Sequence, residues 1–165
     1  MTIFLGADHG GFEKKQQIIE WLKSLPKTVQ DAARQSHNDA TAWEIKDLGT
    51  YSFDPGDDYP HYGFAVAQNV AKTPDSLGIL ICKSGGGVTI AANRVKNARA
   101  VECWNEDSVR HARNDNDANI LALSGLWLSS EQMKSLITLW LTTSSSNEER
   151  HLRRRQQLDT IPNEQ

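Results

Sequence analysis

The stretch "ICKSGGGVTI" places a cysteine, a serine and three glycines directly after an apolar run. Cys82 closes "SLGILIC", an uninterrupted apolar segment that is typical of a parallel strand covered on both faces. Gly85, Gly86 and Gly87 let the backbone turn its N–H groups toward one point, and the helix expected after them begins with a positive dipole end. The loop therefore predicts a cradle for an oxyanion or a phosphate.

Two nucleotide-binding patterns do not fit this loop. An NTPase phosphate loop needs Gly-x-x-x-x-Gly-Lys-Ser/Thr, whereas Lys83 and Ser84 precede the glycines here. A dinucleotide fingerprint needs a third glycine, and the chain has Ile90 at that position. No set of His, Cys or carboxylate residues has a metal-ligand spacing. We therefore expect a site that uses neither a cofactor nor a metal.

The residues around Cys82 support two interpretations of the thiol. Converging N–H groups at a helix start lower the pKa of a cysteine from about 8.5 toward neutrality, which gives a usable thiolate. A cysteine at the end of a buried strand can equally pack as a small hydrophobic residue. The residues alone leave both interpretations open for Cys82. Cys103 has no glycine loop beside it, so simple packing is favoured there.

Apolar periodicity predicts alternating strands and helices along the chain. We expect a strand and turn at 2–11, strands at 76–84, 98–104 and 119–125, and helices at 12–25, 59–72, 87–95, 106–115 and 129–143. This alternation predicts a single α/β domain over 1–165, with a parallel sheet covered by helices on both faces. Ser129 and Gln132 form a capping-box pattern at the start of the last helix. The segment 26–46 is polar and weakly patterned, and we expect a surface excursion.

Composition excludes several classes of protein. The chain has 165 residues and a formal net charge of −3, which suits one domain and argues against broad contacts with nucleic acid or an anionic membrane. A nucleic-acid-binding module would depend on the arginine-rich tail alone, because no aromatic and basic stacking surface accompanies it. Two cysteines and no signal pattern indicate a reducing cytoplasm, and no apolar run is long enough for a membrane span.

Ligands of open parallel sheets bind beyond the carboxyl ends of the strands. We expect three polar motifs there, at 8–11, 82–87 and 114–117. Near the other end of the chain, Arg150 and Arg154 are four residues apart, so they share one helical face and could clamp a phosphate together. A basic tail of this kind is more often simply solvated.

Five segments resemble, in order, the family of type B ribose-5-phosphate isomerases and their galactose-6-phosphate isomerase relatives. They are "GADHGGFEKK", "DYPHYGFAVA", "GILICKSGGGVTIAANRV", "NDNDANILAL" and "ERHLRRR". The resemblance implies a Rossmann-like three-layer subunit with 26–46 as an insertion. It also implies a homodimer, or a dimer of such dimers, whose active sites lie between subunits, with a C-terminal helix at about 147–158 that reaches the partner. The implied activity is metal-free interconversion of an aldose phosphate and a ketose phosphate.

The resemblance gives the residues of the glycine loop their roles. Cys82 occupies the place of the base that forms an enediolate, and Ser84 matches a residue that hydrogen-bonds the substrate oxygens. Gly85, Gly86 and Gly87 match the loop that binds the oxyanion. One branch of the family has a glutamate as base a few residues later, where this chain has valine, and this favours Cys82.

Other matching positions have supporting roles in the family. Asp8 corresponds to an aspartate that handles the ring oxygen or a sugar hydroxyl, although alone it is typical of a turn residue. His9 corresponds to a histidine close to the phosphate, and Asn116 to an asparagine that holds a sugar oxygen. Arg150 and Arg154 correspond to a phosphate-binding pair on the C-terminal helix.

Two positions depart from the family pattern. Asp115 stands where a histidine usually helps to open the sugar ring, and Leu126 stands where an arginine usually assists with phosphate. Either Asp115 is desolvated and still opens the ring, or the substrate never closes one. Ribose 5-phosphate is therefore the family default, and a tetrose or hexose phosphate is the alternative. A non-catalytic relative that only binds sugar phosphate also stays open.

Overall fold

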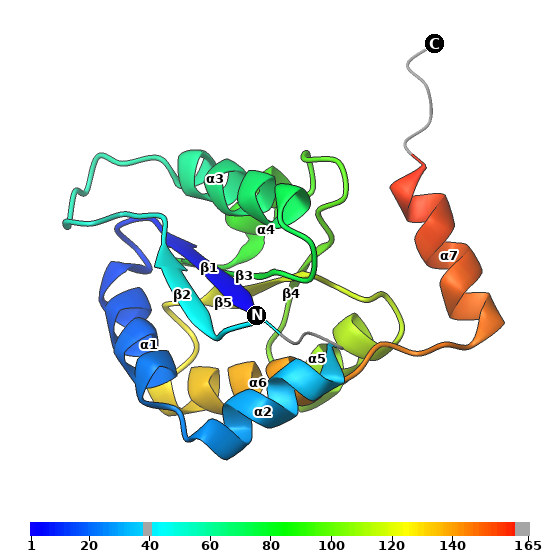
Figure 1. Ribbon diagram of the computed structural model, residues 1–165. Helices are drawn as coiled ribbons and strands as arrows, with labels where there is room; N and C mark the ends of the chain where they lie inside the picture. Colours follow the sequence, from blue (N-terminus) through cyan, green and yellow to red (C-terminus); the bar gives the residue numbers. More distant parts are fainter. Residues whose placement is uncertain (38–40, 161–165) are drawn as a thin grey trace, which may run out of the picture.

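A computed structural model describes residues 1–37 and 41–160. The strands are β1 Thr2–Ala7, β2 Glu44–Asp47, β3 Leu77–Cys82, β4 Ala100–Glu102 and β5 Ile120–Ser124. The helices are α1 Phe12–Ser24, α2 Lys27–Ser36, α3 Tyr59–Lys72, α4 Gly86–Ala92, α5 Glu106–Asn114, α6 Ser130–Thr142 and α7 Glu149–Asp159. The strands form one parallel sheet in the order β2-β1-β3-β5-β4 (Figure 1). No helix in the described ranges is both long and apolar enough to cross a bilayer.

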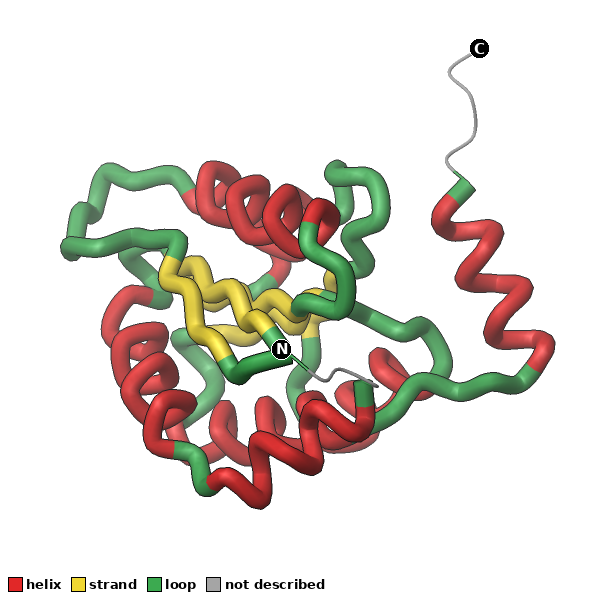
Figure 2. The backbone as a smooth tube through the Cα atoms, viewed as in Figure 1, coloured by secondary structure: helices red, strands yellow, loops and turns green. Residues whose placement is uncertain are grey.

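Helices cover both faces of this sheet, which confirms the predicted fold class. Figures 1 and 2 show α3 and α4 on one face and α1, α2, α5 and α6 on the other. On the first face, Val66 of α3 packs in a cluster with Phe4 of β1. On the second, Ile18 of α1 and Trp140 of α6 pack in a cluster with Leu5. Neighbouring residues of β1 thus serve opposite layers, as strand geometry requires.

The central strand β3 has every residue buried, as its continuous apolar sequence predicts. Ile79 and Ile81 belong to the core beneath α1 and α6. Leu80 and Cys82 belong to the core beneath α3 and α4. Cys82 therefore ends β3 with its side chain on the α3–α4 face.

The predicted capping box at the start of α6 is confirmed. The Ser129 Oγ accepts a hydrogen bond from the backbone N–H of Gln132 at 3.2 Å, and Gln132 Oε1 accepts one from the backbone N–H of Ser129 at 2.8 Å. These bonds satisfy N–H groups that have no partner inside the helix.

The segment 26–46 is more regular than the sequence indicates. It contains α2, where Ala33 is fully buried, and most of β2, which extends the sheet by pairing with β1 from Thr2↔Glu44 to Leu5↔Asp47. The weakly patterned segment therefore contains a helix and an edge strand that its sequence pattern did not predict. Both give weak apolar signals, because α2 buries a single residue fully and β2 is a four-residue edge strand that buries none. Residues 38–40 of the segment lie outside the described ranges.

Helix α7 projects away from the α/β domain at the end of a linker (Figure 1). At its first turn, the ring nitrogen Nδ1 of His151 lies 3.3 Å from the backbone oxygen of Asp115. At its last residue, Asp159 Oδ1 lies 3.0 Å from Arg99 Nη1. The helix expected at about 147–158 is thus present, and the described contacts attach both of its ends to the subunit.

Candidate active site

The sulfur of Cys82 lies beneath the glycine loop. The backbone N–H of Gly85 donates to Cys82 Sγ at 3.1 Å, and Cys82 is 4% exposed. Gly85 has φ +97°, a left-handed conformation that a residue with a side chain adopts only with strain. A glycine is therefore needed where the chain turns its N–H back toward the sulfur.

The end of β5 holds the start of this loop in place. Gly125 donates its backbone N–H to the carbonyl of Cys82 at 2.8 Å, and Leu126 donates to the carbonyl of Lys83 at 3.1 Å. Ser124 Oγ donates to the same Lys83 carbonyl at 2.8 Å. These bonds fix the backbone on which the thiol and the glycines are carried.

The turn after β1 touches the same loop. A Cβ placed on Gly10 would lie 2.9 Å from the backbone nitrogen of Lys83, so the two turns meet backbone to backbone. Asp8 lies in this turn, is 6% exposed and accepts a hydrogen bond from the backbone N–H of Gly11 at 3.2 Å. Burial raises the pKa of Asp8, while the neighbouring His9 opposes the rise. Asp8 is thus a turn-capping residue that also lies beside the Cys82 loop.

His9 has a carboxylate partner that sequence reasoning missed. His9 Nδ1 lies 2.7 Å from Asp57 Oδ1, and the same oxygen accepts the backbone N–H of His9 at 3.0 Å. The hydrogen bond to Asp57 raises the pKa of His9. Although burial opposes it, the hydrogen bonds from His9 lower the pKa of Asp57. The pair favours a cationic imidazole, which suits a phosphate.

The motif at 114–117 lies at the amino ends of the strands, whereas Cys82 lies at the carboxyl end of its strand. This corrects the expectation that all three motifs lie beyond the carboxyl ends. β3 and β5 are parallel, with Gly78 opposite Ile120 and Cys82 opposite Ser124. Residues that precede β5, including Asp115 and Asn116, must therefore lie at its amino end. Within one subunit they cannot join Cys82.

The arginines of α7 also lie apart from the Cys82 loop. Arg150 and Arg154 are exposed, and Arg150 Nε lies 2.8 Å from Glu148 Oε2. Arg155 is turned inward instead and donates through Nη2 to the carbonyl of Ser146 at 2.7 Å. One subunit thus brings together the residues of its β1 and β3 loops, and separately holds Asp115, Asn116 and the exposed arginines.

Residues 3–158 match the family described as Ribose/Galactose Isomerase. The chain belongs to this family. It is similar to ribose-5-phosphate isomerase B of Mycobacterium tuberculosis strain H37Rv, with 35% identity over 154 residues, 93% of this chain and 85% of that protein. It is also similar to ribose-5-phosphate isomerase B of Escherichia coli K12, with 36% identity over 139 residues, 84% of this chain and 82% of that protein.

Solved structures of the isomerase family have the same fold. Ribose-5-phosphate isomerase B from Mycoplasma genitalium with bound ribulose-5-phosphate gives a TM-score of 0.81 at 33% identity, covering 96% of this chain and 93% of that chain. The Clostridium thermocellum enzyme gives a TM-score of 0.80 at 34% identity, covering 96% and 95%.

Asp115 is a carboxylate with a histidine partner. It follows α5, and its Oδ2 lies 2.9 Å from His111 Nδ1. The hydrogen bond from His111 lowers the pKa of Asp115, and the small desolvation that opposes it is outweighed. In the single chain, Asp115 is therefore paired with His111, and burial does not raise its pKa above the ordinary value.

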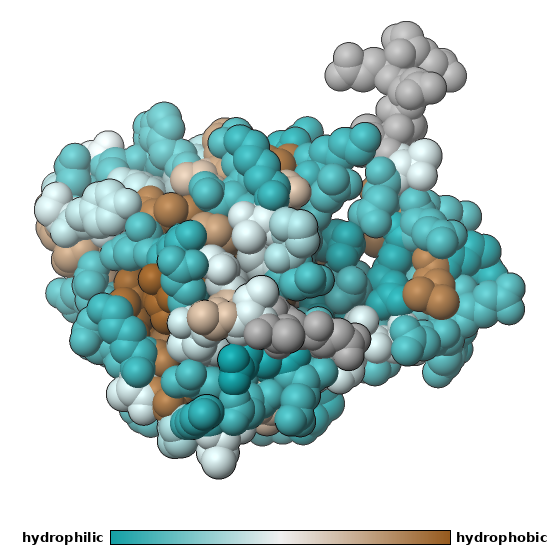
Figure 3. Space-filling view, viewed as in Figure 1, coloured by the Kyte–Doolittle hydropathy of each residue, from teal (hydrophilic) through white to brown (hydrophobic). Residues whose placement is uncertain are grey.

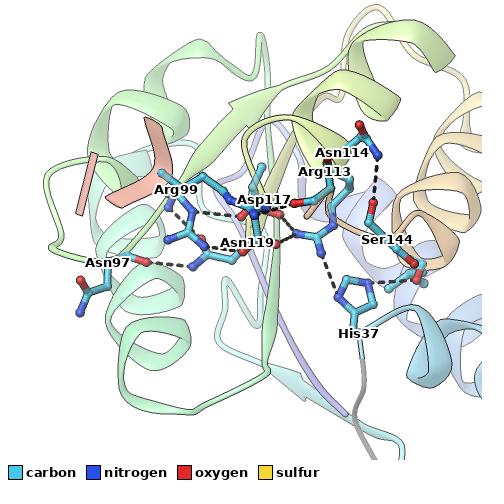
Figure 4. A network of polar contacts seen from close by, with 12 residues as sticks. His37, Asn97, Arg99, Arg113, Asn114, Asp117, Asn119 and Ser144 are labelled. Carbon is cyan, nitrogen blue, oxygen red and sulfur yellow. Dashed lines mark hydrogen bonds and ion pairs between the residues drawn. The ribbon is translucent and has the colours of Figure 1, made fainter. Parts of the chain in front are cut away.

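A polar network holds the 114–117 turn in this isomerase (Figure 4). Arg113 is buried; its Nη2 lies 3.0 Å from His37 Nδ1 and its Nη1 lies 3.1 Å from Asp117 Oδ1. Arg99 Nη2 lies 3.0 Å from the other oxygen of Asp117, and Arg99 Nη1 binds Asp159. The network therefore joins the turn that carries Asn116 to the helix that carries the exposed arginines.

Leu126 lies in an exposed apolar surface. Leu126 and Trp127 follow β5, and both side chains are exposed. Trp127 packs against Trp104, which follows β4, with ring centroids 4.9 Å apart. An exposed apolar surface therefore lies just beyond β4 and β5.

Proposed function

We propose that this protein is an aldose–ketose isomerase that interconverts ribose 5-phosphate and ribulose 5-phosphate, with Cys82 as the base. The observation that carries the proposal is the sulfur of Cys82 held beneath an N–H of the glycine loop, next to the turn of Asp8 and His9. Family membership and the names of the similar enzymes support the substrate. The Mycoplasma genitalium structure with bound ribulose-5-phosphate supports it further.

The reaction needs a base above the carbon next to the carbonyl and donors for the oxygen that becomes negative. Cys82 as a thiolate takes the proton from that carbon, and the electron pair forms the enediolate. The N–H groups of Gly85, Gly86 and Gly87 receive the oxyanion, and Ser84 holds the neighbouring oxygen. Return of the proton to the adjacent carbon completes the isomerisation.

A second copy of the chain completes the site in this proposal. β3 has six residues, so its two ends are about 17–20 Å apart, too far for one pentose phosphate to bridge. Asn116, Arg150 and Arg154 therefore serve the Cys82 loop of a partner subunit. The projecting α7 exposes some apolar surface (Figure 3), and its exposed apolar side chains are Leu152 and Leu158. Such a helix gains stability when a partner covers it.

One observation favours a different sugar as second candidate. Opening a furanose needs a proton moved between the anomeric hydroxyl and the ring oxygen, and an ionised Asp115 is a poor acid near neutral pH. A four-carbon sugar with phosphate on its terminal oxygen cannot close a furanose. A tetrose phosphate would therefore need no acid at this position.

The experiment measures isomerisation of ribose 5-phosphate in heavy water by NMR. Cys82→Ala should lower turnover by about 10²–10⁴-fold, because the base is lost, and should abolish deuterium incorporation at carbon. Cys103→Ala is the matched control, since burial raises the pKa of the Cys103 thiol to about 11 and leaves it protonated. A Cys82→Ala protein that exchanges as fast as the native protein would exclude the mechanism.

A further inference from the structure

Glu102 ends β4 on the same face of the sheet as Cys82. β4 pairs with β5, with Ala100 opposite Ile120 and Glu102 opposite Ala122. Ala100, Ile120 and Ala122 all belong to the core cluster that contains Cys82. Because side chains two residues apart in a strand share a face, Glu102 also lies on this face.

The carboxyl group of Glu102 lies against the glycine loop. A Cβ placed on Gly85 would lie 3.0 Å from Glu102 Oε1. A Cβ placed on Gly86 would lie 3.4 Å from Glu102 Oε2 and 3.9 Å from Ser84 Oγ. The carboxyl and the Ser84 hydroxyl therefore lie on the same side of Gly86. That hydroxyl is the group expected to hold a substrate oxygen.

Glu102 is also an unpaired carboxyl in a half-buried position. Within residues 1–37 and 41–160 it has neither a hydrogen-bond donor nor an ion-pair partner, and burial raises its pKa. Desolvating a carboxyl without a partner costs free energy, so such a group more often serves function than stability. Its neighbour Cys103 stays a thiol, because burial raises the pKa of that thiol to about 11.

The proposed isomerisation leaves one proton transfer without a residue. Cys82 moves the proton between the two carbons, but a second proton must pass between the two oxygens of the substrate. Asp115 could reach a Cys82 loop only from a partner subunit, and the hydrogen bond from His111 lowers its pKa, which makes it a poor acid. Asp8 Oδ1 accepts the backbone N–H of Gly11 within its own turn. Both oxygens of Glu102, by contrast, are free of protein partners beside the loop that binds the oxyanion.

We propose that Glu102 is the general acid–base that carries this proton between the substrate oxygens, an inference that rests on the isomerase activity proposed above. As the Cys82 thiolate removes the carbon-bound proton, the electron pair forms the carbon–carbon double bond. The resulting enediolate oxygen, which the glycine N–H groups hold, then takes the proton of the Glu102 carboxylic acid, which gives an enediol and a carboxylate. The carboxylate then takes the proton of the neighbouring hydroxyl as the new carbonyl forms. The Cys82 thiol returns its proton to the adjacent carbon, and both groups regain their first state.

The test compares Glu102→Gln with the native protein across pH. The amide keeps the size of the side chain but cannot exchange a proton, so kcat should fall about 10²-fold with KM within about twofold. The pH profile of kcat should lose the limb that reports protonation of the Glu102 carboxyl. Glu44→Gln is the matched control, because Glu44 is exposed on the edge strand β2, and it should leave both constants and the profile unchanged.

The outcomes distinguish a failure of the role of Glu102 from a failure of the proposed isomerase activity. If the native protein isomerises and Glu102→Gln keeps its kcat and its pH profile, the role of Glu102 is refuted. If the native protein isomerises no sugar phosphate, the proposed function itself fails. Should Glu102→Gln unfold, Glu102→Asp decides. If Glu102→Asp has a lower kcat and keeps the acid-dependent limb of the pH profile, the result supports the role of Glu102. If its kcat and its pH profile equal those of the native protein, the result overturns that role.

Discussion

Arg99 Nη1 lies 3.0 Å from Asp159 Oδ1, which joins the residue before β4 to the last residue of α7. The same guanidinium donates to the backbone oxygen and to the Oδ2 of Asp117, each at 3.0 Å. Arg99 therefore ties α7 to the turn that carries Asn116. In the proposed dimer this tie fixes the direction in which Arg150 and Arg154 reach the partner subunit.

Asp159→Asn should loosen α7 and weaken the grip on phosphate. Asp159 is 42% exposed at its side chain, so the pair is screened and contributes about 0.5–1 kcal/mol. KM for the sugar phosphate should therefore rise about two- to fivefold, while kcat stays unchanged. Arg110→Met is the control, because it removes the exposed pair of Arg110 with Glu106. Equal KM values in the native protein, Asp159→Asn and Arg110→Met would show that the ion pair of Arg99 with Asp159 does not position α7.

Arg154→Ala should weaken substrate binding by about 1.5–3 kcal/mol, the scale of a hydrogen bond to a charged group. Inorganic phosphate should compete with substrate in the native enzyme and compete less well in the variant. Arg153→Ala is the control, since Arg153 is also exposed on α7 but faces another direction. An unchanged affinity in Arg154→Ala would leave this arginine a solvated surface residue.

Asp57→Asn should move the pH dependence of phosphate binding to lower pH. Asp57 raises the pKa of His9 above 6.5, so the cation is fully present below that value and is lost as pH rises through the raised one. Without the carboxylate the loss begins earlier, and KM above neutral pH should rise about fivefold.

The control for His9 is Asp54→Asn, in the same loop. Asp54 accepts the backbone N–H of Gly56 at 2.9 Å and makes no hydrogen bond to His9. KM would be measured from pH 5.5 to 8.5 in both variants. Identical pH profiles in native protein and Asp57→Asn would show that His9 does not bind phosphate as a cation.

Asp115→His should raise catalytic efficiency on ribose 5-phosphate relative to a tetrose phosphate, because an imidazole near its ordinary pKa can open a furanose. Asp115→Asn should change little, since an ionised carboxylate is already a poor acid. The measurement is kcat/KM for both sugars in the three proteins. A sharp fall on ribose 5-phosphate in Asp115→Asn would show that the aspartate opens the ring.

The glycine loop and its strand could be predicted from the sequence because their signals are local. Cys82 ends a strand of six buried residues, and the turn over the sulfur needs Gly85 only three positions later. The alternation of apolar runs likewise determined the parallel sheet and the helices on both faces. Local signals are weakest where little is buried, and so α2 and the edge strand β2 were missed.

Only the tertiary structure decided which distant residues meet. His9 and Asp57 are 48 positions apart, and no pattern distinguishes Asp57 from the other aspartates of its loop. Glu102 lies beside the glycine loop because the sheet has the strand order β3-β5-β4, which puts the carboxyl end of β4 two strands from that of β3. Packing decides this order, and the sequence pattern does not reveal it. Because β3 and β5 are parallel, Asp115 and Asn116 lie at the amino end of β5, while Cys82 lies at the carboxyl end of β3. A residue that precedes one strand and a residue that follows the neighbouring parallel strand lie a strand length apart, even when both are expected to contact the same substrate.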